Sequence, residues 1–278
     1  MNSVRCAVFI SVVASVFAVP PVGAQPSLPV TISGNEIKAE IDLPGGIGAD
    51  LSIQFENVVG LVPGALSLSA QIVNPFEILP RLPGFGTTLP SGFPVLVRIV
   101  PSAGSALSFS GVYRISIHTH NLHLDSRLPV SFFTAHGPSD RFADITTFVG
   151  MGSYRAGGDG GGFSDFIVLL DLRAIDPVIV GKFADVQETL AEHAGVIAPA
   201  ALADLQARLA QARTYYDTGL TVSAIAAMTT FSEKVVEYSG TSIPDVWRAN
   251  DDLENVAGYL RSQAGTLRFS LTVKAGRR

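Results

Sequence analysis

Apolar and polar residues alternate along short stretches of the first part of the chain, which is the pattern of half-buried β-strands. Residues 37–43 place Ile, Ala, Ile and Leu at the odd positions and charged residues between them. Seven further stretches follow similar logic: 51–55, 66–73, 95–100, 112–124, 130–134, 145–149 and 163–172. About eight strands are therefore expected, separated by turns of glycine and proline. The proline-rich residues 74–94 are expected to form a long loop.

The spacing of apolar residues changes after Pro177 to every third or fourth position, which is typical of amphipathic helices. One stripe consists of Leu202, Leu205, Leu209, Ala212 and Tyr216. Residues 179–194, 222–238 and 253–271 show comparable stripes, and the polar run 250–252 is the expected N-terminal cap of the last helix. Four helices joined by short connections favour an antiparallel bundle.

The two patterns together predict a segregated α+β chain. Residues 25–175 are expected to form an antiparallel β-sandwich domain, immunoglobulin-like in general shape, because no helical pattern interrupts the strands. Residues 176–278 are expected to form an antiparallel helical bundle domain.

The first 24 residues resemble a secretory signal peptide. Arg5 precedes an apolar run at residues 7–19, and small residues end at Ala24, after which cleavage is expected. The run is shorter than the roughly 20 residues that a membrane-spanning helix needs. We therefore expect a secreted or periplasmic protein, with no transmembrane segment in the mature chain.

Composition narrows the classes of function. Hydrophobic residues make up 47% of the 278 residues and charged residues 15%, which favours a packed core over disorder. A net charge of −5 is unsuited to nucleic-acid binding. The one cysteine, Cys6, lies in the expected signal peptide, so the mature chain would have no disulfide and no cysteine chemistry.

Three of the five histidines, His118, His120 and His123, fall close together. Residues two apart on a strand share a face, so His118 and His120 could hold one metal ion, with His123 reaching it from the turn beyond. The spacing resembles the His-x-His-x-Asp-His signature of metallo-β-lactamase-type hydrolases, although Leu122 stands at the aspartate position. Zinc binding is one alternative, a purely structural triplet the other. His136 could join them if its strand pairs with 112–124.

Two further motifs are weaker. The sequence around Ser153 resembles a nucleophile elbow but lacks the Gly-x-Ser-x-Gly order. Residues 157–162, Gly-Gly-Asp-Gly-Gly-Gly, are not followed by the Lys-Ser/Thr of a phosphate-binding loop. We expect this segment to be a flexible hairpin loop, because glycines permit positive φ angles.

Part of the helical region resembles the FIMAH-type module of bacterial extracellular proteins. The matching positions are Gly219, Ala224, Phe231, Val235, Ser239, Gly240 and Ile243, with Met228 in place of the usual leucine and Thr241 in place of the usual lysine. The mature chain as a whole resembles a family of uncharacterised exported bacterial proteins. The residues that carry this resemblance are 152–155, Phe163-Ser164 and 243–248. The resemblance implies export and the architecture described above, but no activity.

These observations favour an exported, non-enzymatic binding or structural protein of the bacterial envelope or extracellular space, with no cofactor. No motif combines a nucleophile or metal with a recognisable base. Its partner would be an envelope or extracellular protein or a glycan. The alternatives are a metal-binding protein or metal-dependent hydrolase that uses His118, His120 and His123, and a glycan-binding module.

Overall fold

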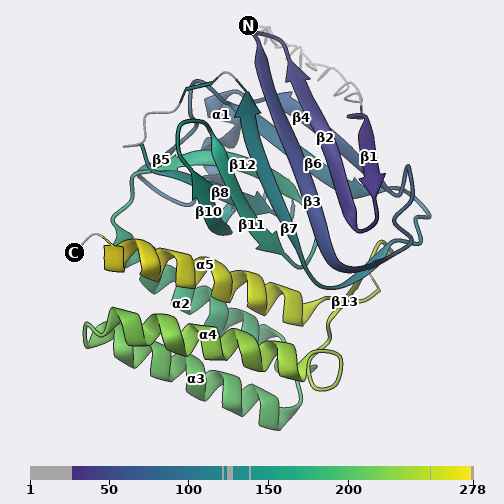
Figure 1. The fold of residues 1–278 in the computed structure, drawn as a ribbon. Helices are drawn as coiled ribbons and strands as arrows, with labels where there is room; N and C mark the ends of the chain where they lie inside the picture. Colours follow the sequence, from purple (N-terminus) through teal and green to yellow (C-terminus); the bar gives the residue numbers. More distant parts are fainter. Residues whose placement is uncertain (1–26, 121, 124–127, 138, 251, 277–278) are drawn as a thin grey trace, which may run out of the picture.

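A computed structural model describes residues 27–120, 122–123, 128–137, 139–250 and 252–276. The expected signal peptide, 1–24, lies outside the described residues. The chain is α+β: two antiparallel sheets are followed by helices in the C-terminal half (Figure 1). Among the described helices, none is long and apolar enough to cross a membrane.

The first sheet has the strand order β1-β2-β3-β7-β11-β10, and β13 also pairs with β7. Its strands are β1 (Val30–Ser33), β2 (Glu36–Leu43), β3 (Ile47–Val59), β7 (Ser108–His120), β10 (Thr146–Gly150), β11 (Arg155–Gly160) and β13 (Val246–Arg248). The strand predicted from alternating residues is confirmed in β2, where Ile37, Ala39 and Ile41 are buried and the charged residues between them are exposed.

The second sheet has the order β4-β6-β12-β8-β9, with β5 paired to β12. Its strands are β4 (Leu66–Ile72), β5 (Thr87–Thr88), β6 (Val95–Pro101), β8 (Val130–Ala135), β9 (Ala143–Asp144) and β12 (Asp165–Asp171). Both sheets contribute to one apolar core: Leu51, Phe55 and Ile115 of the first sheet lie in the same cluster as Phe132 and Phe166 of the second.

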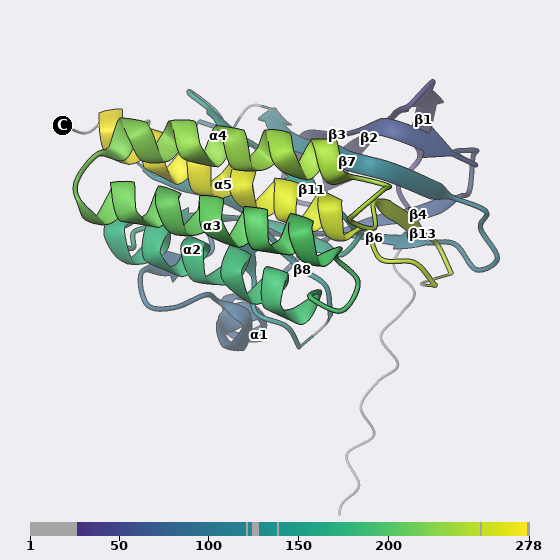
Figure 2. The same cartoon turned by 90° about the horizontal axis from the view of Figure 1, so that it is seen from below.

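The C-terminal region forms four long helices: α2 (Ile175–Glu192), α3 (Pro199–Asp217), α4 (Thr221–Tyr238) and α5 (Val256–Gly276). They share a second core that includes Phe183, Leu205, Phe231 and Leu267. Helices α2 and α5 lie nearest the strands, and α3 and α4 lie further out (Figures 1 and 2). Helix α5 contacts β7, β10 and β11 directly.

Helix α5 is buried on two faces. Its apolar face, which includes Leu260 and Leu267, packs in the helical core. Its other face carries the small or polar buried residues Gly258, Ser262 and Thr266, of which Gly258 and Ser262 meet the segment 159–161 and Thr266 contacts Lys182 of α2. Small side chains allow a helix backbone to approach a sheet closely, so α5 joins the two cores.

Several sequence expectations need correction. Residues 74–94 are not simply a loop, because they contain α1 (Pro75–Ile78), the 3₁₀ helix η1 (Leu79–Arg81) and β5. Helix α5 begins at Val256, so Asn250 and Asp252 are not its cap as expected, and residue 251 lies outside the described residues. Asn255 is its cap, since the Asn255 side chain accepts a hydrogen bond from the Gly258 amide at 2.7 Å.

The glycine-rich segment is also different from the flexible hairpin loop that we expected. Residues up to Gly160 form β11, which pairs with β7 and β10. A Cβ atom at Gly158 would lie 2.2 Å from the Ile145 carbonyl oxygen, and one at Gly161 would lie 2.7 Å from the Tyr259 nitrogen. The glycines therefore serve close packing of the strand against its neighbours and against α5.

Candidate functional site

A cleft of about 630 Å³ opens where α2 and α5 meet the strands. Its walls come from α2, from the first half of α5, from the glycine segment after β11 and from the loop that joins β8 to β9. Clefts of about 300 to 1,000 Å³ between structural units are the usual place for small ligands in proteins. We therefore take this cleft as the candidate site.

Helix α2 supplies a carboxylate wall. Asp185, Glu188 and Glu192 are spaced three and four residues apart, so they lie on one face of the helix, and all three line the cleft. Among the described residues, none of them forms an ion pair. Burial in the cleft, followed by repulsion from Glu188, raises the pKa of Asp185. The wall is thus a concentration of negative charge on an exposed face of α2.

Tyr259 of α5 lies against the glycine segment in the cleft. A Cβ atom at Gly162 would lie 2.5 Å from the Tyr259 hydroxyl oxygen, so only glycine leaves room for this side chain. The ring of His136 meets that of Tyr259 edge-on, with 5.6 Å between the centroids. Together they give the cleft an aromatic surface beside the carboxylate wall.

The loop between β8 and β9 is held in place by a buried arginine. Arg81 donates hydrogen bonds to the carbonyl oxygens of Gly137 at 2.9 Å and Asp140 at 3.0 Å. Its guanidinium also contacts the Asp165 carboxylate at 3.0 Å, and Arg98 donates two more hydrogen bonds to that carboxylate. Asp140 and its neighbours in the cleft wall are therefore tethered to the second sheet.

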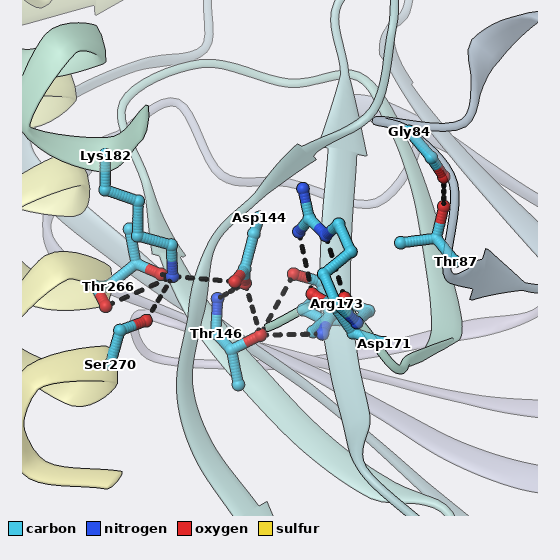
Figure 3. A network of polar contacts seen from close by, with 10 residues as sticks. Gly84, Thr87, Asp144, Thr146, Asp171, Arg173, Lys182, Thr266 and Ser270 are labelled. Atoms are coloured by element: carbon cyan, nitrogen blue, oxygen red, sulfur yellow. Dashed lines mark hydrogen bonds and ion pairs between the residues drawn. The ribbon is translucent and has the colours of Figure 1, made fainter. Parts of the chain in front are cut away.

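The buried Lys182 lines the cleft, and Figure 3 shows the polar contacts that it makes. The Lys182 ammonium is 2.6 Å from the Asp144 carboxylate, and it donates hydrogen bonds to the hydroxyls of Thr266 at 2.6 Å and Ser270 at 2.8 Å. Asp144 also accepts a hydrogen bond from the Thr146 amide at 2.8 Å. Because acceptors of three residues surround the ammonium, this lysine ties α2, α5 and β9 together and is poorly placed to act as a nucleophile.

Asp144 belongs to two cavities. Besides the main cleft, it lines a second cavity of about 240 Å³, to which Ser270 also contributes. Asp144, the partner of Lys182, therefore lies between the main cleft and the smaller cavity, where the helices meet the strands.

The histidines singled out in the sequence lie elsewhere. His118 and His120 are on the outward face of β7, with 6.3 Å between their ring centroids, and His123 is exposed beyond the strand. His120 pairs with Asp50 at 2.8 Å, and this hydrogen bond raises the pKa of His120, which favours the protonated ring over a metal ligand. His136 does not join them, because β8 pairs with β12 and β9 and not with β7.

No three histidine, cysteine, aspartate or glutamate residues in the described part of the chain are grouped closely enough to hold a metal ion. Zinc binding by His118, His120 and His123 stays a prediction. Metal analysis of the wild-type protein beside a His118→Ala/His120→Ala variant tests it, since the prediction requires bound zinc that the variant loses.

The sequence reasoning missed the cleft residues. Asp185, Glu188 and Glu192 resemble an ordinary solvated helix face, because the wall opposite them comes from a distant segment. Lys182 left a signal: it is a charged residue among the apolar positions Ile179, Phe183 and Val186 of α2, which form its buried stripe. A charge in such a position predicts a buried partner.

Comparison with known protein families places the chain in one of them. Residues 12–275 match the model of DUF6689, a family of unknown function. The chain belongs to this family, which agrees with the resemblance to an uncharacterised family seen in its sequence. No curated protein matches the chain. No solved structure matches it either.

Proposed function

We propose that this protein is an exported, non-enzymatic binding protein whose ligand site is the cleft between α2, α5 and the strands. The observation that carries the proposal is the cleft itself, which combines a size suited to small molecules, unpaired carboxylates and the Tyr259 ring. A binding role fits Lys182, whose ammonium is engaged by protein acceptors.

Blocking the cleft tests this proposal. Ala143 is exposed and lines the cleft, so Ala143→Trp would fill it without displacing core residues. Ala200→Trp, at an exposed position of α3 outside the cleft, is the matched control. In a thermal-shift screen of amines, sugars, amino acids and nucleotides, at least one class should raise the melting temperature of wild type and Ala200→Trp by several degrees but not that of Ala143→Trp. If no class separates Ala143→Trp from wild type, the cleft is not a ligand site.

Export is the second part of the proposal. Arg5, the apolar run 7–19 and the small residues before Gln25 support it, although they lie outside the described residues. Expression of the whole chain in a bacterium, followed by mass spectrometry of the purified protein, should find Gln25 at the N-terminus in the periplasm or medium. An intact N-terminus in the cytoplasmic fraction would contradict export.

We also propose a finer description of the architecture: an immunoglobulin-like β-sandwich and an antiparallel helical bundle, the latter related to the FIMAH-type module. The apolar core shared by both sheets and the three-residue connection between α3 and α4 support this description. An experimental structure compared with both classes tests it, and a different strand connectivity or helix order would refute it.

A further inference from the structure

We propose that the ligand of the cleft is a small organic cation that carries amino or guanidino groups, with its charge against Asp185 and Glu188 and its carbon skeleton on Tyr259. This inference rests on the proposed function, and it specifies the chemical class of the ligand.

The first argument is the charge balance of the cleft. The lining contains the five carboxylates Asp140, Asp144, Asp185, Glu188 and Glu192, against the cations Arg141 and Lys182 and the titratable ring of His136. Asp144 and Lys182 neutralise each other at 2.6 Å. The remaining carboxylates outnumber Arg141, so a cation entering the cleft gains attraction while an anion is repelled.

The second argument is independent of charge. The amide oxygen of Gln263, a residue that lines the cleft, is buried and accepts no hydrogen bond from the described residues, while its amide nitrogen donates to the Thr189 hydroxyl at 2.8 Å. A buried acceptor without a donor is costly. The N–H groups of an amine or guanidine are donors only, and they would supply what this oxygen lacks once the Gln263 side chain turns it toward the cleft, because no solvent reaches the oxygen in the ligand-free structure.

The third argument concerns the kind of cation. The described residues offer no group of three metal ligands, which disfavours a bare divalent ion. The Tyr259 ring, by contrast, suits an ammonium or guanidinium group with attached carbon atoms, because such cations are attracted to aromatic faces and bury their methylene groups against them. The aromatic surface and the carboxylate wall face the same cleft.

Titration calorimetry with spermidine tests the inference on the complete mature chain. Asp185→Asn and Glu188→Gln preserve the shape of the side chains and remove one charge each. Each should weaken spermidine binding about fivefold, and the double variant at least tenfold. Glu233→Gln is the matched control, because Glu233 is an exposed glutamate of α4 outside the cleft, and it should bind as wild type does.

A second measurement guards against loss of folding. Asp185 is exposed on α2 and forms no ion pair among the described residues, and the nearby Glu188 carboxylate repels its charge, so folding does not depend on that charge. Asp185→Asn should therefore melt at or slightly above the wild-type temperature while it binds spermidine less tightly. Weaker binding together with a lower melting temperature would count against a direct contact.

The outcomes separate this inference from the proposed function. If spermidine binds all variants equally, or is displaced by Mg²⁺ at equal charge concentration, the cleft does not recognise an organic cation and the inference fails. If spermidine does not bind but a neutral sugar does, and Ala143→Trp blocks that sugar, the inference fails while the proposed function stands. If Ala143→Trp weakens the binding of no ligand, whether spermidine or a sugar, then both the inference and the proposed function fail.

Discussion

Lys182 occupies a position in α2 that the helical pattern assigns to an apolar side chain, and it is only 5% exposed. Its charge is tolerated there because Asp144, Thr266 and Ser270 surround the ammonium with acceptors. Two of these partners lie 84 and 88 residues away in the sequence. Buried pairs of this kind define which segments meet more than they add to stability.

Removal of one partner should therefore be costly. Asp144→Asn leaves the Lys182 ammonium buried without its counter-charge and should lower the free energy of unfolding by about 3 kcal/mol. The control is Asp217→Asn, which breaks the exposed Asp217–Arg213 pair of α3 and should cost under about 1 kcal/mol. Urea unfolding of both variants measures the difference. Equal effects would mean that the buried pair is no more important than a surface pair.

At the scale of elements, the docking of α5 on the first sheet depends on residues without side chains. Gly161 contacts the backbone of α5 at Gly258 and Tyr259, so any side chain there would push the helix away from the sheet. The same approach places Tyr259 in the cleft. The contact between strand and helix thus shapes the candidate site.

Gly161→Ala should lower the free energy of unfolding by about 1 to 3 kcal/mol, because its Cβ atom would lie 2.7 Å from the Tyr259 nitrogen. Gly181→Ala is the opposite case. Gly181 lies within α2, and beyond the backbone of the helix itself no atom lies inside 4 Å of the added Cβ, so alanine should stabilise the protein by about 0.5 to 1 kcal/mol. Thermal or urea unfolding should show changes of opposite sign, and a neutral Gly161→Ala would refute the close contact.

A salt bridge between β3 and α5 should make this docking sensitive to pH. Partial burial opposes the charge of Glu56, but two hydrogen bonds from Arg261, at 2.6 and 2.7 Å, lower the pKa of Glu56 below its ordinary value of 4.5. The unfolded chain therefore takes up the proton first as the pH falls. The stabilisation is complete above about pH 5 and is lost as the pH falls through the lowered pKa of the folded state.

Glu56→Gln removes this dependence. We expect the variant to be less stable than wild type at pH 7, by about 1 kcal/mol, and the difference to shrink toward pH 3. Urea unfolding across this pH range measures it. A difference that stays constant with pH would show that the Glu56 carboxylate does not titrate as proposed.

At the scale of the whole molecule, the C-terminal region is built into the strands. Strand β13 follows α4 in sequence but pairs with β7 in the first sheet. Trp247 of β13 is buried beside Phe109 and Phe163, at centroid distances of 5.3 and 5.0 Å. The C-terminal region therefore adds a buried side chain to the core of the sheets, and its helices line the cleft together with the strands.

We expect this sharing to produce one cooperative unfolding transition. Trp247 is the one tryptophan of the chain, so its fluorescence reports on the junction, while circular dichroism at 222 nm reports mainly on the helices. In urea the two signals should change at the same midpoint. Separate midpoints would show that the helices and the sheets unfold independently.

Eight of the strands and all four long helices could be predicted, because the side-chain periodicity of each is encoded within its own residues. The strands that were missed are β1, β5, β9 and β13, which span two to four residues, and the glycine-rich β11. Short strands hold too few residues to show a period. Glycines have no side chain to display one.

The candidate site could not be predicted in the same way. Its carboxylates, Tyr259 and the tethered loop at Asp140 come from segments that meet only in the folded chain, and each segment looks ordinary when considered alone. Local alternation of apolar and polar residues was enough to establish an α+β chain with strands first and helices after. Three features were decided only by the tertiary structure: the partner of Lys182, the pairing of β13 with β7 and the position of the cleft. Each depends on contacts between residues far apart in the sequence, and local side-chain periodicity carries no information about such contacts.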